Sequence, residues 1–432
     1  MARWLDARAA DFAQSFAALL AMSREADEDV SAAVRAIIAD VRARGDAALI
    51  ELSARFDKVN LTKETLRLSD AEIDAAKDAC GREALAALDV AAKRIEDYHR
   101  RQIPKDESYV DDAGVKLGWR WTALDSVGLY VPGGTASYPS SVLMNAIPAV
   151  VAGVKRIVMV TPASGGAINP LSIEAARRAG VREIYRIGGA QAIAALAYGT
   201  QTVAAVDKIV GPGNAYVASA KREVFGAVGI DSVAGPSEIL IVADGANDPD
   251  WIAADLLSQA EHDTSAQSIL ITDDAGFAKK VEEAVLRALT LLPRKAIAEA
   301  SWSHNGAIIL VEKIADAAPL VDKIAPEHLE IATADPEALL KRVRHAGAIF
   351  LGRHTPEAMG DYIAGPNHVL PTARTARFSS GLSVLDFVKR TTLLSCTPDA
   401  IAKLGPDVIA LAEAEGLDAH ARSVAARLNA KR

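Results

Sequence analysis

The sequence predicts an α/β protein with two doubly wound, Rossmann-like domains built on parallel sheets. Short apolar runs, such as 156–160 and 238–242, alternate with alanine-rich stretches that read as helices, and glycine-rich turns follow several of these runs. This succession of strand, turn and helix occurs in two sets along the chain, and repeated βα units form parallel sheets. A chain of 432 residues is also too long for one ordinary core, so we expect at least two domains.

The expected elements follow from the same patterns in chain order. The first hundred residues read as helices, and over 30–44, for example, an apolar stripe stops before Gly45. The last residues, 406–432, read as a helical tail that is broken near Gly416. Between these ends we expect short apolar strands at 156–160, 183–187, 207–210, 238–242, 268–272, 307–311 and 348–351.

Composition and charge narrow the classes of function. The formal net charge is -8 and there is no long basic tract, which argues against a nucleic-acid partner. The first residues lack the apolar core of a signal peptide, and no apolar run approaches the roughly twenty residues that span a bilayer. The two cysteines, Cys80 and Cys396, lie far apart in unlike contexts, so we expect neither a disulfide nor a cysteine metal cluster. The protein is therefore expected to be cytoplasmic.

A glutamine and a histidine three residues apart, Gln259 and His262, are the most informative candidates for a site. On the helix expected here, positions i and i+3 share one face, so both side chains can reach one ion. Zinc usually has four ligands, however, and a histidine near a core is commonly a hydrogen-bonded structural residue. Further donors at Asp361, His368 and His420 are spread along the chain, and their spacing does not force them together. Nitrogen and oxygen donors without thiolates would suit zinc, manganese or a similar ion.

The adjacent Glu327 and His328 follow Pro326 and form a candidate acid/base pair. A histidine tuned near neutral pH and a glutamate that activates water can face one cavity if the backbone is irregular, whereas in a strand they point to opposite faces. A solvated charged turn is the simpler interpretation of the local sequence. Neither cysteine is an attractive nucleophile, because Cys80 lies in a polar helical stretch and Cys396 follows apolar residues.

Glycine turns at the ends of expected strands form a third candidate. The dinucleotide fingerprint G-x-G-x-x-G is absent; the turn that starts at Gly211 comes near it but has Tyr216 where the third glycine belongs. The turn at 131–135 has backbone amides that could hold a phosphate or a substrate, although such turns are commonly only turns. Several glycine turns at the carboxyl ends of strands strengthen the prediction, because ligands of doubly wound sheets bind there.

Nine longer motifs occur along the chain: GLYVPGG at 128–134, YPSSVLMN at 138–145, GGAQA at 188–192, VGPGN at 210–214, AGPSE at 234–238, QAEHD at 259–263, PEHL at 326–329, GPNH at 365–368, and EGL at 415–417 with His420. Together they resemble the histidinol dehydrogenase family over essentially the whole chain. So many long motifs in the right order make the resemblance specific.

The resemblance implies an NAD-dependent, four-electron oxidation of L-histidinol through L-histidinaldehyde to L-histidine, the last step of histidine biosynthesis. Two NAD+ would be reduced and one water consumed. The family's acid/base pair falls on Glu327 and His328. One zinc ion per subunit would be held by residues of this set: Gln259, His262, Asp361 and His420.

The resemblance also implies where the two small molecules bind. Contacts to NAD fall on Tyr130, Gln191 and Asn214. Substrate contacts fall on His368 and on residues that include the zinc shell: Ser237, Gln259, His262, His328, Asp361, Glu415 and His420. The family forms an intertwined homodimer, in which the tail that carries the last two of these residues completes the partner's site.

With this resemblance, the chain is expected to divide into four parts. These are an N-terminal helical segment at 1–25, a first α/β domain with the metal and acid/base residues at 26–128 and 238–377, a second, NAD-binding α/β domain at 129–237, and a C-terminal helical tail at 378–432.

Other functions stay open at the level of the sequence. A related dehydrogenase could act on another diol or amino alcohol, such as a sulfonated propanediol, with most of the same motifs. A zinc hydrolase would also use zinc, a glutamate and a histidine to activate water. A non-catalytic scaffold would need no acid/base pair. Formation of NADH from histidinol separates these classes.

Overall fold

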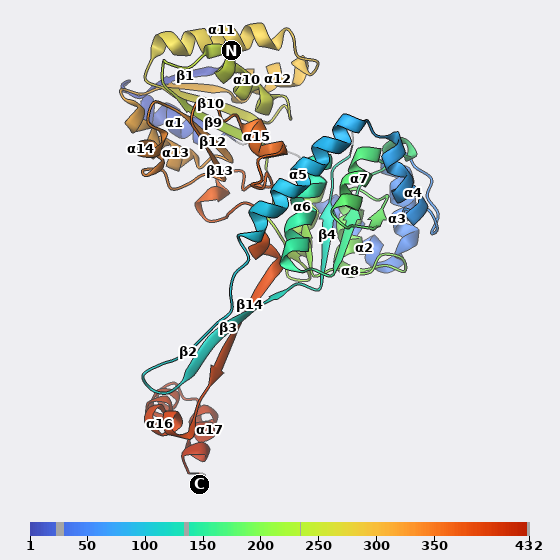
Figure 1. The fold of residues 1–432 in the computed structure, drawn as a ribbon, viewed down its shortest axis with the longest axis vertical. Helices are drawn as coiled ribbons and strands as arrows, with labels where there is room; N and C mark the ends of the chain where they lie inside the picture. The colour runs from blue at the N-terminus through green and yellow to red at the C-terminus, as the bar shows by residue number, and fades with distance from the viewer. Residues whose placement is uncertain (23–29, 134–137, 234, 430–432) are drawn as a thin grey trace.

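The protein has two α/β lobes side by side and an extended arm that ends in two helices (Figure 1). The computed structural model describes the chain in four stretches: 1–22, 30–133, 138–233 and 235–429. Two residues of the motifs, Gly134 and Ala234, and Thr135 of the turn at 131–135 therefore lie outside the described residues. Among the described residues, no helix combines the length and the apolar character needed to cross a membrane.

A six-stranded parallel sheet forms one lobe, in the order β1-β11-β10-β9-β12-β13. Helices cover both faces, which buries the central strands along their whole length and explains their continuous apolar runs. The strands are β1 (Arg3–Asp6), β9 (Glu238–Ala243), β10 (Gln267–Thr272), β11 (Ala307–Leu310), β12 (His328–Ala332) and β13 (Ala348–Leu351). One face packs against α10 (Pro249–Ala260), α11 (Ala275–Leu289) and α12 (Lys295–Asn305), and the other against α1 (Phe12–Leu20), α13 (Ala318–Ile324) and α14 (Pro336–Leu340).

A five-stranded parallel sheet forms the second lobe, in the order β6-β5-β4-β7-β8. Its strands are β4 (Ser126–Tyr130), β5 (Arg156–Val160), β6 (Glu183–Tyr185), β7 (Lys208–Val210) and β8 (Gly229–Ile230). One face packs against α2 (Ser31–Arg44), α3 (Asp46–Phe56), α8 (Gly189–Tyr198) and α9 (Ala215–Val224), and the other against α4 (Asp70–Ala75), α5 (Arg82–Arg100), α6 (Pro139–Ala152) and α7 (Pro170–Arg178).

Both sheets follow the same path in space. The first strand of each set lies in the centre, the second and third are added on one side, and the fourth and fifth on the other. The direction of winding therefore changes between β4 and β7 in one sheet and between β9 and β12 in the other. This confirms the prediction of two doubly wound parallel sheets.

The arm is an antiparallel three-stranded ribbon that carries a helical hairpin. The ribbon pairs β2 (Glu107–Val110), β3 (Lys116–Ala123) and β14 (Val388–Ser395), and the hairpin consists of α16 (Pro398–Ala414) and α17 (Asp418–Leu428). The ribbon holds the hairpin well away from both lobes (Figure 1). The break expected near Gly416 is confirmed, because this glycine has a φ of 72° between the two helices.

Three parts of the predicted division were wrong. The segment 1–25 is not purely helical, because Arg3–Asp6 forms β1 and pairs with β11. The helices of 26–128 cover the five-stranded sheet rather than the sheet of 238–377, since their apolar faces share cores with strands such as β5. The tail at 378–432 contains β14 in addition to its helices. In each case the partner strand or sheet lies far away in sequence, so the local pattern does not reveal it.

Candidate active site

The candidate acid/base pair lies at the amino end of β12, the strand between β9 and the edge strand β13. The switch point of the six-stranded sheet lies between β9 and β12. His328 is the first residue of β12, and its Nδ1 lies 3.0 Å from the main-chain oxygen of Glu238 at the start of β9. A carbonyl oxygen only accepts, so Nδ1 donates and the neutral ring carries its lone pair on Nε2. Among the described residues Nε2 has no hydrogen-bond partner, although it is buried.

Glu327 is held by a reciprocal pair of hydrogen bonds with Glu238. The main-chain N–H of Glu238 donates to Oε2 of Glu327 at 2.9 Å, and the N–H of Glu327 donates to Oε2 of Glu238 at 3.2 Å. Oε2 of Glu327 also lies 3.7 Å from Nδ1 of His328. Both members of the pair are buried, so the interpretation of this segment as a solvated charged turn was wrong. A neighbouring strand provides the hydrogen bonds that bring the two side chains together.

Both pKa values of this pair lie above their ordinary values, but for different physical reasons. Burial raises the pKa of Glu327 to about 8, while the positive charge of His328 acts to lower it. Burial acts to lower the pKa of His328, but the carboxylates of Glu357, Glu327 and Asp361 together raise it well above its ordinary value. A cation bound nearby would lower both pKa values, because it stabilises carboxylates and disfavours imidazolium.

Gln259 reaches the site from the last turn of α10. Asp248 caps this helix at its N-terminus and Pro249 occupies the first turn. The side chain of Gln259 is buried, and in the amide orientation that satisfies its neighbours the nitrogen donates to Oε1 of Glu357 at 2.7 Å. The amide oxygen then accepts the main-chain N–H of Glu238 at 3.0 Å.

Asp361 places a carboxylate next to the buried Nε2 of His328. It lies on α15 (Glu357–Tyr362), and its Oδ1 is 3.4 Å from that nitrogen. Burial acts to raise the pKa of Asp361, but the contact with His328 and the charges of His368 and His262 lower it overall. These interactions place the predicted ligand His262 within electrostatic reach of Asp361.

His368 connects the site to the other lobe. Its Nδ1 donates to the main-chain oxygen of Asp361 at 2.7 Å, and its Nε2 lies 3.1 Å from the hydroxyl of Ser141 on α6. The two lobes therefore meet at His368, one of the substrate contacts that the family resemblance implies. Ser237 directly precedes β9, so it lies at the same strand edge as the acid/base pair.

The chemistry of this group suits a divalent cation. One ligand atom each from His328, Glu357 and Asp361 lie within 4.8 Å of one another. The set combines imidazole nitrogen with carboxylate oxygen, and the unpartnered Nε2 points into it. Two of the predicted ligands belong to or contact this group. Asp361 is a member and lies beside His328, and Gln259 donates its amide to Glu357.

Two acidic residues of the site were missed at the level of the sequence. Glu238 ends the motif AGPSE and Glu357 follows Pro356 at a helix start, and neither position has a local signal of its own. Only the packing of β9, β12 and α15 shows that both face the pair formed by Glu327 and His328.

The two predicted site residues of the tail, the zinc ligand His420 and the substrate contact Glu415, lie elsewhere in this chain. Glu415 directly follows α16 and His420 lies in α17, and both side chains are exposed on the arm. The ribbon carries them away from the lobes (Figure 1), so a single chain does not bring them to Gln259.

The predicted NAD contacts lie at the carboxyl edge of the five-stranded sheet. Tyr130 ends β4, and its hydroxyl accepts the main-chain N–H of Gly189 at 3.1 Å. Burial raises the pKa of this tyrosine to about 12, so it stays protonated. Gln191 is buried in the first turn of α8, and Asn214 caps α9 by accepting the N–H groups of its first turn. These residues flank the switch point between β4 and β7.

Two side chains, Asp231 and Lys221, hold the turn that begins at Gly211 by hydrogen bonds to its backbone. Gly211 has a φ of 110°, and a Cβ there would clash with the carbonyl oxygen of Tyr130. Its N–H donates to Asp231 at 2.8 Å, and the buried Lys221 donates to its carbonyl oxygen at 3.1 Å. Lys221 and Asp231 also form a buried ion pair. Glycine is therefore required at the turn by backbone geometry, whereas Tyr216 points outward from α9 and leaves the packing undisturbed.

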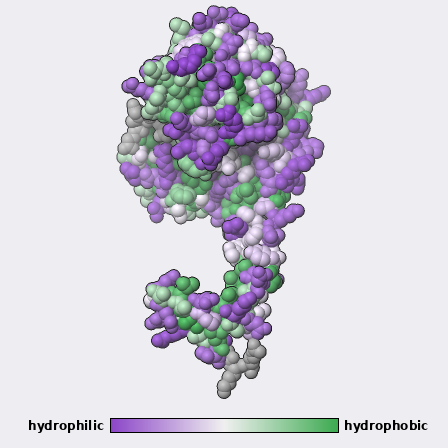
Figure 2. Space-filling view, turned by 90° about the vertical axis from the view of Figure 1, so that its left-hand side faces the viewer, coloured by the Kyte–Doolittle hydropathy of each residue, from purple (hydrophilic) through white to green (hydrophobic). Residues whose placement is uncertain are grey.

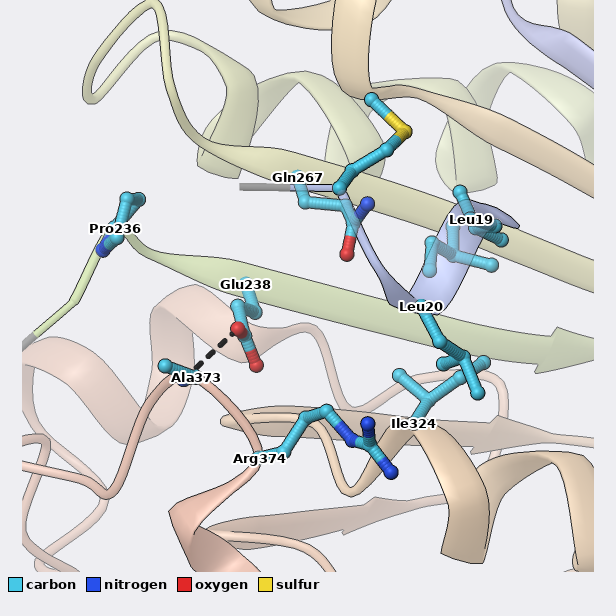
Figure 3. A pocket seen from close by; sticks show the side chains of 10 residues that line it. Leu19, Leu20, Pro236, Glu238, Gln267, Ile324, Ala373 and Arg374 are labelled. Atoms are coloured by element: carbon cyan, nitrogen blue, oxygen red, sulfur yellow. Dashed lines mark hydrogen bonds between the residues drawn. The ribbon is translucent and has the colours of Figure 1, made fainter. Parts of the chain in front are cut away.

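A small pocket of about 210 Å³ lies at the amino ends of β9 and β10 (Figure 3). Its wall is mostly apolar, and Glu238 borders it while accepting the N–H of Ala373 at 3.0 Å. The side chain of Arg374 also lines it. Glu327 and His328 do not line this pocket, so Glu238 stands between the pocket and the reactive pair.

Comparison with known proteins gives a consistent assignment. Residues 20–428 match the family described as histidinol dehydrogenase. A histidinol dehydrogenase of Agrobacterium fabrum is 65% identical over 429 residues, with 99% of each chain covered. One of Rhizobium meliloti is 67% identical over 418 residues, covering 97% of this chain and 96% of that protein. A crystal structure of histidinol dehydrogenase from Elizabethkingia anophelis superposes with a TM-score of 0.95 at 37% identity, covering 99% of this chain and 98% of that one. This chain belongs to the histidinol dehydrogenase family.

Proposed function

We propose that this protein oxidises L-histidinol through L-histidinaldehyde to L-histidine, with two NAD+ reduced and one water consumed. Membership of the family supports the reaction. The single observation that supports it within the site is the buried pair Glu327 and His328, anchored on Glu238 beside a group of cation ligands. This arrangement suits an alcohol oxidation followed by water attack, and it needs no cysteine nucleophile.

His328 would act as the base that takes the proton of the substrate hydroxyl. Its Nδ1 is committed to the main-chain oxygen of Glu238, so Nε2 is the atom that can exchange a proton with the substrate. Because the ring begins a buried central strand, it is held in a fixed place relative to the second carboxylate, Asp361.

Glu327 would activate the water that attacks the aldehyde. Its Oε2 accepts the main-chain N–H of Glu238, which fixes one carboxylate oxygen and leaves the other to accept a water proton. The resulting gem-diol is then oxidised to the acid. Retention of the aldehyde between the two steps would protect a reactive intermediate from solvent.

A divalent cation, zinc by family resemblance, would be held by Gln259, His262 and Asp361, with His420 of the partner subunit. When bound, it would orient the nitrogen atoms of the substrate and act as a Lewis acid. The substrate would also contact Ser237 and His368, and Glu415 of the partner subunit would pair with its ammonium group.

NAD would bind at the carboxyl edge of the five-stranded sheet, against Tyr130, Gln191 and Asn214. Two features of this edge support the proposal: the glycine turn at the switch point, and the N-terminus of α9 that follows this turn. Bound NAD+ would accept the electrons released in each of the two oxidations.

The protein would work as a homodimer that exchanges arms, in the cytoplasm. Apolar side chains stay exposed along the arm, as the patches on its outer part show (Figure 2): Leu393, Leu394, Leu404, Val408, Leu411 and Leu417. A partner subunit that covers them would bury this surface and bring His420 to a site that lacks its fourth ligand.

A direct assay tests the proposal. Purified protein with histidinol and NAD+ should form two NADH for each histidinol consumed, with histidine as the product. A single NADH per substrate, or activity only with another diol, would replace the proposal by a related dehydrogenase. Hydrolysis of an ester or amide without NADH would indicate a zinc hydrolase. The His328→Asn variant serves as the inactive control.

A further inference from the structure

We propose that Glu357 is a positioning residue that fixes the amide of Gln259 so that its oxygen, and not its nitrogen, is available to the cation. This inference rests on the metal-dependent function proposed above. It adds a residue that neither the sequence motifs nor the resemblance assigned.

A glutamine ligand has an orientation problem that a carboxylate ligand does not have. The two ends of the amide are nearly equal in size, but only the oxygen can ligate a cation, since the nitrogen has no free lone pair. A buried glutamine must therefore be oriented by its neighbours. A carboxylate only accepts hydrogen bonds, so it selects the NH2 end of an amide.

Glu357 is placed to make this selection. Its Oε1 lies 2.7 Å from the amide nitrogen of Gln259, and the amide oxygen accepts the main-chain N–H of Glu238 at 3.0 Å. One lone pair of the amide oxygen is then still available for a ligand. The amide nitrogen thus donates to Glu357 and the amide oxygen accepts from Glu238. A reversal of the two ends of the amide would lose both hydrogen bonds.

Glu357 is itself held on several sides. Its side chain is buried, and the hydroxyl of Ser258 lies 3.3 Å from Oε2 and 2.8 Å from the main-chain oxygen of Asp255, so its one proton is shared between the two oxygens. Its main-chain N–H donates to Oε1 of Glu330 at 2.7 Å. Ser258 and Gln259 are neighbours on α10, so one helix end supplies two donors to the two oxygens of one carboxylate. The carboxylate cannot rotate away without loss of both.

Direct ligation by Glu357 is the competing role. Its Oε1 is 3.8 Å from Nε2 of His328, close enough for both to approach one ion. That same oxygen receives the amide of Gln259 at 2.7 Å, however, so direct ligation by Oε1 would compete with this hydrogen bond and favour the longer contact of 3.3 Å to Oε2. The positioning role and the ligand role predict different outcomes when the amide of Gln259 and the carboxylate of Glu357 exchange places.

The test is an exchange of the amide and the carboxylate. Glu357→Gln and Glu357→Met should each weaken zinc binding about 10- to 100-fold, because the orienting acceptor is altered or lost. Gln259→Glu should also weaken it, because two carboxylates would stand in contact. The double variant Gln259→Glu with Glu357→Gln restores one donor and one acceptor, with a ligand oxygen at either end of residue 259. Its zinc affinity should return to within about threefold of the unmodified protein.

Zinc affinity is measured by competition with a chelator, and the absorption spectrum of the cobalt-substituted protein reports the ligand set. The cobalt spectrum of the double variant should match that of the unmodified protein. Glu174→Gln is the matched control: it alters a buried glutamate in the other lobe and should leave zinc affinity unchanged. Thermal unfolding of every variant shows whether the chain is folded.

Three outcomes would overturn the proposal. Unchanged zinc affinity in both Glu357→Gln and Glu357→Met would show that the carboxylate does not orient the ligand. A double variant no better than the weaker single variant, with an altered cobalt spectrum, would assign Glu357 as a direct ligand. If the unmodified protein binds no divalent cation, the metal-dependent function fails as well, which distinguishes that result from the first two.

Discussion

Apart from the additional strand β1, the two parallel sheets have the same strand order, but they present their functional residues at opposite ends of their strands. In the five-stranded sheet, Tyr130 and the turn at Gly211 lie where strands end, next to the switch point. In the six-stranded sheet, Glu327 and His328 lie where a strand begins. The difference teaches that strand order alone does not fix the position of a site. Binding at the carboxyl edge follows the general rule for such sheets, whereas the amino edge is used here for acid/base chemistry.

The largest effect should come from the amino edge of the six-stranded sheet. The Glu327→Gln variant should slow water attack by about 10²- to 10⁴-fold, because an amide cannot act as the base, while alcohol oxidation is less affected. Single-turnover measurement of NADH should then show a first oxidation that is faster than the second. Its affinity for NAD+ should be unchanged. Equal slowing of both oxidations would contradict the division of roles between Glu327 and His328.

The complementary change lies at the carboxyl edge of the five-stranded sheet. Lys221→Met should lower the free energy of unfolding by about 3–5 kcal/mol, because it leaves the buried Asp231 without its ion-pair partner. It should also weaken binding of NAD+, since both residues brace the turn at Gly211. Calorimetric titration with NAD+ and denaturant unfolding measure the two effects.

The exposed Lys63→Met is the control for the loss of a lysine charge in the same lobe. Zinc affinity should be the same in both lysine variants. If Lys221→Met weakened zinc binding as strongly as NAD+ binding, the two edges would not be functionally separate.

Mixed dimers test whether the arm of one chain completes the site of the other. His262→Asn and His420→Asn should each abolish activity when alone, because every site lacks a ligand. Random mixing by reversible dissociation should restore about a quarter of the unmodified activity, since half of the dimers then contain one intact site. Activity that stays at the level of the separate variants would refute a shared site.

The smallest effect concerns a buried histidine of α5, on the five-stranded lobe. Burial lowers the pKa of His99 below the 6.5 that it would have in the unfolded chain. The unfolded state therefore takes up this proton first, and stability is lost as the pH falls below about 6.5, by at most about 1.4 kcal/mol per pH unit. Denaturant unfolding at pH 7 and at lower pH should show a smaller pH dependence for His99→Asn than for the unmodified protein. The same slope in both would show that this histidine is not the source.

The sequence predicts seven of the eleven strands that the structure describes in the two parallel sheets, because their apolar runs are local signals, but it misses β4, β8 and β12 as well as β1. The runs at 156–160 and 238–242, for example, are β5 and most of β9. It fails for β1, whose four residues have no periodicity of their own and depend on pairing with β11. It fails similarly for β14, whose partner β3 is more than 260 residues earlier in the chain.

The candidate site divides in the same way. Gln259 and His262 can be paired from their spacing, and the cap at Asp248 fixes where α10 begins, but the expected single helix is wrong at its end, because α10 stops at Ala260 and His262 lies in the turn that follows. Their connection with Asp361 came only from family resemblance, since no spacing rule relates α10 to α15. Glu238 and Glu357 could not be found at all, because their roles depend on hydrogen bonds to residues more than 85 positions away.

The ribbon that holds α16 and α17 away from the lobes has a consequence for how the protein behaves on dilution. If each site borrows His420 from the other chain, a monomer has no complete site at either lobe. Specific activity would then fall as the protein concentration approaches the dimer dissociation constant, even when every chain is folded. Zinc would leave under the same conditions, so metal retention and assembly would share a single concentration dependence.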